Sequence, residues 1–369
     1  MILSRLQLKA SIMFWPVLAY SPFFFTLWVY DIIIIGYFAL IASFLFLSVK
    51  RYFKNDVYIL FMILLYSTIL IIRNSSGMSG IFTIGNYCLT IIFGWGLYRH
   101  LISKKYRFEM FLDLYVKFFY LIVIFSFFSL VFFLTIGEFD IFQFKSETYT
   151  HKVTPFGVLI KKTFGPITIY RSFFYFVEPV HVSIFYAANI SLIGPLLKKN
   201  KKNFIRINYI GAVLAMSMTF LVIMAVVFML NRIRSSITMI LMIIFAVFLL
   251  LFIQLIDMYS YSSCGDRVER FLIFFNMMKQ ANITQWLFGY GVLFETGESK
   301  AFNSGLTLSI FEAGILGTVL QILIFITMVP NLLVFVIFVL SALVLDPLHM
   351  PMFWLMIILA SYAKKNNST

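Results

Sequence analysis

One polar segment of the chain combines a guanidinium and a carboxylate at a spacing that suits anion binding and proton transfer. Arg171 and Glu178 enclose the run Ser-Phe-Phe-Tyr-Phe-Val, and Pro179 follows directly. A guanidinium can hold a phosphate in a two-pronged hydrogen bond, and a carboxylate can accept the proton of a sugar hydroxyl. The same residues also fit a simple helix start, because proline suits the first turn and an acid is stabilised at a helix N-terminus. Both interpretations stay open.

A second polar segment, residues 266–279, mixes charged and apolar residues at helical spacing. Arg267 and Arg270 are i and i+3, so a helix would place them side by side on one face. Two adjacent guanidinium groups suit a diphosphate better than one, and a helix of this composition is expected to lie in the membrane interface. The alternative is an interfacial helix whose arginines pair only with lipid phosphates or with Glu269.

Glycines and a buried acid follow this segment. Gly289 and Gly291 stand two positions apart and predict a turn; a third glycine and a preceding buried strand, which a dinucleotide site needs, are absent from the sequence. Gly314 and Gly317 in the next apolar run are typical of closely packed membrane helices. Glu312 lies in the same run, where a carboxylate is costly and normally has a partner or a function.

Metal ligands are scarce in the sequence. The four histidines are scattered without the spacing of a metal site. Glu138 and Asp140 open the segment that leads to Arg171, and two carboxylates could hold a divalent ion there. A solvated loop end fits this pair better, so we expect neither a metal nor a cofactor.

The composition identifies the setting in which these residues act. Of 369 residues, 62% are hydrophobic and 12% are charged, whereas soluble proteins have about 45–50% and about 25%. No aqueous core could bury so much apolar surface, so we expect an all-α, polytopic integral membrane protein with a single domain over residues 1–369. The net charge of +14 is split into short clusters without a continuous basic face, which argues against a nucleic-acid partner. Cys88 and Cys264 predict no disulfide framework.

About twelve transmembrane helices explain the apolar runs. Basic residues gather in alternate short loops and near both ends of the chain; because such clusters stay in the cytoplasm, both termini are predicted to be cytoplasmic. Residues 205–231 either cross once or form a hairpin of two short helices, and the basic clusters on both sides favour the hairpin. Residues 137–179 and 257–304 then become two long periplasmic loops. The other predicted spans are 12–30, 31–49, 57–72, 81–98, 114–136, 180–197, 236–256, 305–329, 332–345 and 350–363.

The order of these features resembles the O-antigen polymerase (Wzy) family, which is related to the O-antigen ligases. Phe302 stands where ligases carry a histidine next to the asparagine, which favours polymerase over ligase. Met218 follows Ser217 where many relatives carry an arginine, which puts one expected phosphate contact in question. Besides the span count, the resemblance is carried by Arg171, Phe176, Glu178, Pro179, Arg267, Arg270, Trp286, Gly289, Gly291, Asn303, Glu312, Gly314 and Gly317.

The resemblance implies a glycosyltransferase of the bacterial inner membrane that polymerises undecaprenyl-diphosphate-linked oligosaccharide repeat units into O-antigen or a related surface polysaccharide. The growing glycan would pass from one lipid carrier to a new lipid-linked unit at the periplasmic face. The catalytic residues expected from it are Glu178, Arg267 and Arg270, with the arginines on the donor diphosphate and the glutamate on the acceptor hydroxyl. Membrane lipid and a chain-length regulator protein are further expected partners. The expected substrate-binding residues are Arg171, Asn303, Glu312, Gly289 and Gly291.

A transporter that flips lipid-linked oligosaccharides is the main alternative to a polymerase, and a ligase is a further one. Transporters tend to place ionisable residues near the middle of the membrane and to be built from repeated halves. Here the charged residues gather at the ends of the spans and in the outer loops, and the sequence has no visible internal repeat. These features favour the polymerase.

Overall fold

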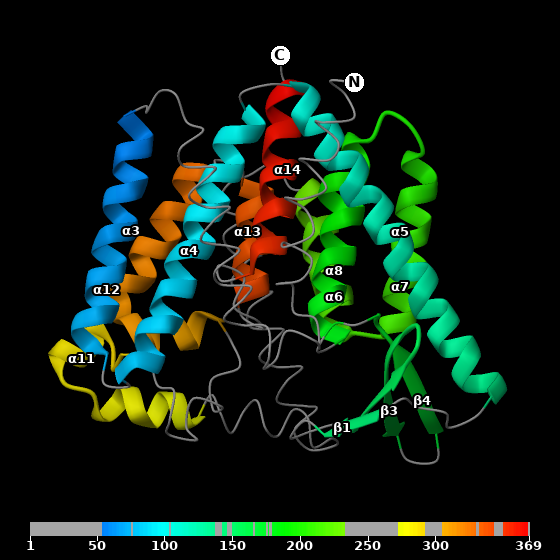
Figure 1. The fold of residues 1–369 in the computed structure, drawn as a ribbon, viewed down its shortest axis with the longest axis horizontal. Coiled ribbons are helices and arrows are strands. Elements are labelled where there is room, and N and C mark those ends of the chain that lie inside the picture. The colour runs from blue at the N-terminus through cyan, green and yellow to red at the C-terminus, as the bar shows by residue number, and fades with distance from the viewer. Residues whose placement is uncertain are drawn as a thin grey trace. The chain divides into compact units, whose positions relative to one another are not determined.

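The computed structural model is mainly helical in the residues that it describes (Figure 1). Four of its helices are long and apolar enough to cross a membrane: Lys54–Arg73, Phe108–Ile136, Pro179–Leu196 and Gly305–Met328. This agrees with a helical membrane protein, while the total of about twelve spans and their direction remain predictions. The predicted spans 12–30, 31–49 and 236–256 lie outside the described residues. The described residues are 54–74, 77–102, 105–136, 142–145, 150–164, 167–174, 176, 179–232, 272–291, 305–329, 332–342 and 350–367.

Large apolar side chains point outward along several of these helices. On α3 (Lys54–Arg73), Phe61, Leu64 and Ile72 expose between 61% and 75% of their surface, and Leu134 on α5 (Lys105–Ile136) exposes 64%. A soluble protein rarely leaves such contiguous apolar faces in water. Lipid contact removes the cost of this exposure, so the outward faces fit a membrane environment.

The chain divides into two compact units, and the described residues of the first contain the helices α5 to α8 and a small sheet. After α5 come the strands and then α6 (Pro179–Ala188), which starts at Pro179 as the sequence predicted. α6 continues into a π-helical turn, η2 (Asn189–Ile193), and a short 3₁₀ helix, η3 (Gly194–Leu196). Two further helices, α7 (Lys201–Ala215) and α8 (Met218–Arg232), both pack against α6.

Residues 205–231 form two helices and not one long crossing. α7 ends at Met216, which takes a left-handed conformation with φ 45° and donates its N–H to the carbonyls of Ala212 and Val213. α8 begins two residues later, and the Tyr209 and Phe220 rings lie 6.2 Å apart across the turn. The two helices agree with the hairpin that the basic clusters favoured, and the two membrane crossings stay a prediction.

A four-stranded antiparallel sheet occupies the first predicted long loop, and the sequence analysis did not foresee it. The strands are neighbours in chain order: β1 (Phe142–Lys145), β2 (Thr150–Thr154), β3 (Gly157–Phe164) and β4 (Ile167–Ser172). In Figure 1 the sheet lies at the opposite end of the first unit's helices from the turn that joins η3 to α7. That turn carries the exposed residues Lys198 and Lys199. The predicted outer loop and a predicted cytoplasmic cluster thus lie at opposite ends of one unit.

One face of the sheet packs on α5 through small polar and aromatic contacts. Ser172 donates its hydroxyl to the Ser126 carbonyl at 2.6 Å, and the hydroxyls of Ser129 and Thr154 lie 2.8 Å apart. The Tyr170 and Phe133 rings pack in a tilted arrangement with their centres 4.6 Å apart, and the ammonium of Lys152 lies 5.3 Å from the centre of the Phe133 ring. These contacts fix β2 and β4, and with β4 also Arg171, on the C-terminal part of α5.

A buried chain of hydrogen bonds connects three helices of the first unit. The Tyr115 hydroxyl on α5 donates to the Asn189 side chain at 2.7 Å, and the Asn189 amide donates to the Asn208 side chain on α7 at 2.8 Å. Asn208 in turn donates to the Phe204 carbonyl at 2.7 Å. These side chains are fully buried, and a buried amide is costly unless its hydrogen bonds are made. The network therefore specifies how α5, α6 and α7 pack.

The second unit is built around α3 and α12 (Gly305–Met328). Phe325 of α12 stacks at 4.0 Å on Phe338, and the Trp354 ring packs so closely on Gly94 that a Cβ there would come within 2.6 Å of it. Residues 272–280 form a helix that lies across the ends of α3 and α12 together with α11 (Figure 1), as predicted for the described part of the interfacial segment. The remaining helices are α4 (Gly77–Ile102), α11 (Ile283–Phe288), α13 (Leu332–Ala342) and α14 (Pro351–Asn367).

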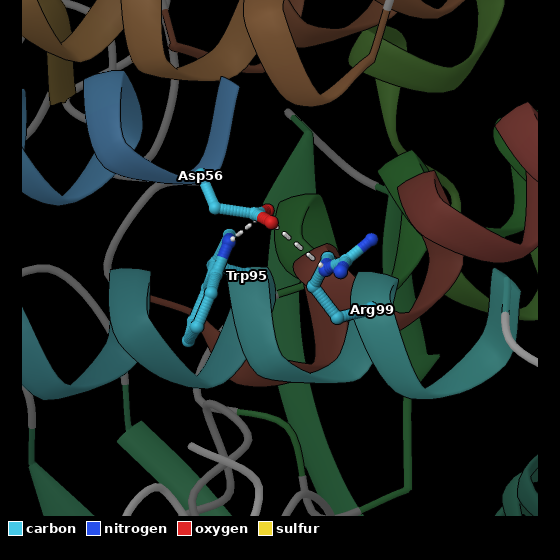
Figure 2. Close-up of polar contacts among 3 residues, drawn as sticks. All are labelled: Asp56, Trp95 and Arg99. Carbon is cyan, nitrogen blue, oxygen red and sulfur yellow. Dashed lines mark hydrogen bonds and ion pairs between the residues drawn. The ribbon is translucent and has the colours of Figure 1, made fainter. Parts of the chain in front are cut away.

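A buried ion pair joins the start of α3 to the end of α4. Asp56 accepts a hydrogen bond from the Trp95 indole at 3.0 Å and pairs with the Arg99 Nε at 3.2 Å (Figure 2). The two charged side chains expose only 4% and 13% of their surface. Breaking a buried pair leaves one charge uncompensated, so this contact holds α3 and α4 in one register.

Candidate functional site

The structure describes four of the eight predicted site residues. Arg171 belongs to the first unit, and the second unit contains Gly289, Gly291 and Glu312. The other predicted site residues, Glu178, Arg267, Arg270 and Asn303, lie outside the described residues, as does the acidic pair Glu138 and Asp140. The geometry of the candidate site therefore comes from Arg171 and from the glycine segment.

A capped short helix delivers the glycine segment to its place. The Asn282 side chain accepts the Gln285 N–H at 2.8 Å, and the Gln285 side chain accepts the Asn282 N–H at 2.9 Å. This capping box starts α11. Gly289 ends the helix with φ 77° and donates its N–H to the Gln285 carbonyl at 2.8 Å, the position where helices favour glycine. The local sequence thus defines both ends of α11.

We call the contact between residues 287–291 and residues 311–314 of α12 the glycine junction. The Tyr290 N–H donates to the Phe311 carbonyl at 2.7 Å, and the Gly291 N–H donates to the Glu312 carbonyl at 3.0 Å. α12 is broken at this point, because Gly314 has the non-helical angles φ 67° and ψ −171°. The break frees helix carbonyls that the incoming segment then satisfies.

Three glycines make this approach possible. A Cβ on Gly314 would lie 2.5 Å from the Gly289 nitrogen, and a Cβ on Gly289 would lie 2.6 Å from the Gly314 nitrogen. A Cβ on Gly291 would overlap the carbonyl of Arg73 at the end of α3. Each of the three also has a positive φ, which favours glycine. Gly289 and Gly291 thus have a packing role, and their predicted contact with substrate stays a prediction.

Gly314 differs from the sequence expectation in one respect. The spacing of Gly314 and Gly317 predicted close approach of another helix. At Gly317 a Cβ would overlap the Ala313 Cβ of α12 itself, whereas the Tyr66 ring of α3 would lie at the ordinary contact distance of 3.6 Å, so the approach of α3 does not require this glycine. At Gly314 the approaching element is the turn after α11, and α12 bends to receive it.

Arg73 is the residue of this region that the sequence analysis did not select. It is the last residue of α3, it is half-buried, and its Nε donates to the Gly289 carbonyl at 3.0 Å. The available signal was its position as the single basic residue in the short segment 73–80. The structure thereby adds a guanidinium to the glycine junction.

Glu312 occupies the first half of α12, two residues before the break. Its side chain is 5% exposed, and its carbonyl accepts the Gly291 N–H. Its burial in an apolar helix agrees with the prediction that this carboxylate occupies a costly position. A substrate contact for it stays a prediction.

Tyr290 fixes the outer part of the glycine junction. Its ring stacks on Phe311 at 4.6 Å with the planes 5° apart, and its hydroxyl donates to the Met277 carbonyl at 3.0 Å. Burial raises the pKa of the Tyr290 hydroxyl, so the phenol remains a donor at neutral pH. The buried residues Phe274 and Met278 of the helix 272–280 belong to the same apolar cluster.

Arg171 lies on β4, where it pairs in register with Ile160 of β3. It is half-buried, and the sheet continues past it because Val158 accepts the Phe173 N–H and donates to the Phe174 carbonyl. α6 starts soon afterwards, with the Ser183 hydroxyl on the Pro179 carbonyl at 2.7 Å. Arg171 thus lies on a strand that ends a few residues before the start of α6.

The described residues contain no group of three or more His, Cys, Asp or Glu side chains that could hold a metal ion. Searches of protein-family models, of curated proteins and of solved structures found no match to this chain. The geometry above and the sequence motifs are therefore the basis for a functional proposal.

Proposed function

We propose that this protein is a membrane glycosyltransferase that polymerises undecaprenyl-diphosphate-linked oligosaccharide units at the periplasmic face of the bacterial inner membrane. In this proposal the growing glycan leaves its lipid diphosphate and joins a hydroxyl of a new lipid-linked unit. Arg267 and Arg270 bind the donor diphosphate with Arg171 assisting, and Glu178 accepts or orients the acceptor proton. Asn303, Glu312, Gly289 and Gly291 support the site.

The glycine junction is the observation that carries the proposal. The motifs around Gly289 and around Glu312 are separate in the sequence, yet in the second unit they meet through two backbone hydrogen bonds. The helix that leads into this junction has a partly exposed apolar surface, with Phe275 at 58%. Such a surface suits the membrane interface, where a lipid diphosphate would be found.

The first unit supports the proposal independently. Its sheet lies at the end of the helices opposite the exposed lysines that join η3 to α7. By the positive-inside rule this arrangement supports an outer location for the sheet. Arg171 is held on this sheet close in sequence to the start of α6. An arginine in such a location can reach anionic groups at the membrane surface.

Apart from Glu312, which is buried in α12, the polar residues described inside the helices do not favour a transporter. In the described helices, the buried network of Tyr115, Asn189 and Asn208 is uncharged and internally satisfied. The buried ion pair Asp56–Arg99 joins helix ends. A lipid-linked oligosaccharide flippase would more often use ionisable residues along its path.

Deletion and complementation in the native bacterium test the proposal. Loss of a polymerase is expected to leave single repeat units that are translocated and capped, while long polymer disappears. Loss of a flippase is expected to leave uncapped units on the inner leaflet. The composition of the capped glycans, measured by mass spectrometry, distinguishes the two. Retention of long polymer after deletion would reject both.

A further inference from the structure

Arg73 is a charged residue whose hydrogen-bonding capacity is only partly used. A guanidinium has five N–H donors and a permanent positive charge. In Arg73, Nε donates to the Gly289 carbonyl. Its two terminal nitrogens make no hydrogen bond or ion pair to any residue in the described parts of the chain. A half-buried positive charge is thus presented at the end of α3.

The surrounding backbone fixes the direction of this guanidinium. The Nε hydrogen bond ties it to Gly289, and Gly291 packs against the Arg73 carbonyl with no room for a Cβ. Gly291 is in turn bonded to the Glu312 carbonyl. The side chain is therefore pre-organised, so binding an anion would cost little of its conformational entropy.

The neighbouring elements favour a position of Arg73 at the level of lipid phosphates. α3 is long and apolar enough to cross a membrane, and Arg73 is its last residue. The helix 272–280 and α11 lie across this end of α3 (Figure 1) and expose Phe275, Ile283 and Trp286 by 39–78%. Exposed aromatic and aliphatic groups of this kind settle at the membrane interface. A cation at that depth meets phosphate groups.

We propose that Arg73 is a phosphate-binding residue of the glycine junction, with its two terminal nitrogens on a phosphate group of a membrane-inserted lipid. This inference rests on the proposed function for the identity of the lipid, the diphosphate of the glycan carrier. The phosphate of an ordinary lipid headgroup shares the same chemistry and is the second possible source. Either source requires the forked geometry of a guanidinium, which an ammonium lacks.

Chemical modification of the unaltered protein tests the inference without a variant that could disturb the junction. The full chain in dodecyl maltoside micelles, whose headgroups contain no phosphate, is treated with phenylglyoxal, which reacts with the terminal guanidinium nitrogens, and the Arg73 peptide is quantified by mass spectrometry. With undecaprenyl diphosphate at ten times its dissociation constant, about one-tenth of the sites stay open, so modification should slow about tenfold. Undecaprenol, which lacks phosphate, should give no protection.

A second set of conditions in the same experiment distinguishes the two possible sources of phosphate. Nanodiscs of phosphatidylglycerol without added diphosphate should leave Arg73 reactive if the carrier diphosphate is the ligand. Slow modification there would assign the site to a headgroup phosphate. Equal reactivity of Arg73 under all of these conditions overturns the inference.

A pair of charge variants gives an independent readout. Arg73→Lys keeps the charge but loses the fork, and it should weaken undecaprenyl diphosphate binding by about tenfold or more. Lys279→Met removes an exposed charge from the neighbouring helix and should leave binding unchanged. Normal binding by Arg73→Lys overturns the inference. If undecaprenyl diphosphate protects Arg73 from phenylglyoxal but the protein makes no polymer, the proposed function is rejected while the inference of a phosphate site stands.

Discussion

Replacement of Gly314 by alanine should undock the segment that follows α11 from α12. Gly314 has φ 67° and ψ −171°, a region that is essentially restricted to glycine and costs other residues about 1–3 kcal/mol. The new Cβ would overlap the Leu287 carbonyl and lie 2.5 Å from the Gly289 nitrogen. Relief of these contacts breaks the two hydrogen bonds of Tyr290 and Gly291, each worth about 0.5–1.5 kcal/mol.

The backbone cost and the loss of the two hydrogen bonds together destabilise the docked state by about 2–6 kcal/mol.

Two other glycines of the second unit serve as controls that separate the backbone cost from the loss of contacts at the glycine junction. A Cβ on Gly77, with φ 62°, or on Gly85, in the middle of α4, would meet nothing within 4 Å. Gly77→Ala therefore carries only the backbone cost of about 1–2 kcal/mol. Gly85→Ala should be neutral or slightly stabilising, because alanine favours a helix.

Hydrogen exchange measured by mass spectrometry on the protein in nanodiscs checks this prediction. If the free energy of local opening falls by about 2 kcal/mol, the amides of Tyr290 and Gly291 exchange about 30-fold faster. Gly77→Ala and Gly85→Ala should leave the exchange of these two amides unchanged. Unaltered protection of residues 287–291 in Gly314→Ala would refute the assignment of these contacts.

Three further predictions concern the ion pair, the polar network and the proposed diphosphate site. Arg99→Met should destabilise the detergent-purified protein by about 3–5 kcal/mol, because Asp56 loses its buried counter-charge; adding Asp56→Asn should restore most of the midpoint in a thermal melt. Asn208→Leu should lower the same midpoint, because the amide of Asn189 loses its acceptor. Arg267→Ala or Arg270→Ala should abolish long polymer and leave capped single units, and normal polymer at normal protein levels would remove these arginines from the mechanism.

Features set by neighbouring residues were predictable from the sequence. Pro179 marks the start of α6 because a missing N–H costs nothing in a first turn. A break within residues 205–231 followed from the basic clusters on both sides, which favour an even number of crossings, although the exact position of the turn did not. The helix at 272–280 followed from the spacing of its apolar residues. Each of these inferences needed only local chemistry or the positive-inside rule.

Features that depend on distant residues were not predictable. The strands of the first long loop carry Lys152, Lys161 and Lys162, and the sequence analysis predicted no strand in this segment. Burial of Lys152 against Phe133 depends on packing between β2 and α5. The contact of Arg73 with Gly289 joins residues 216 positions apart. No periodicity in a single sequence reports such a contact.

Direct assay of glycan growth by the purified protein tests the central proposal. The protein is reconstituted in proteoliposomes with undecaprenyl-diphosphate-linked repeat units from the native bacterium, and the lipid-linked products are resolved by mass spectrometry. A polymerase is expected to give a ladder of lipid-linked oligomers, with one undecaprenyl diphosphate released for each added unit. Repeat units that cross the bilayer without growing, or that stay unchanged with correctly folded protein, would contradict it.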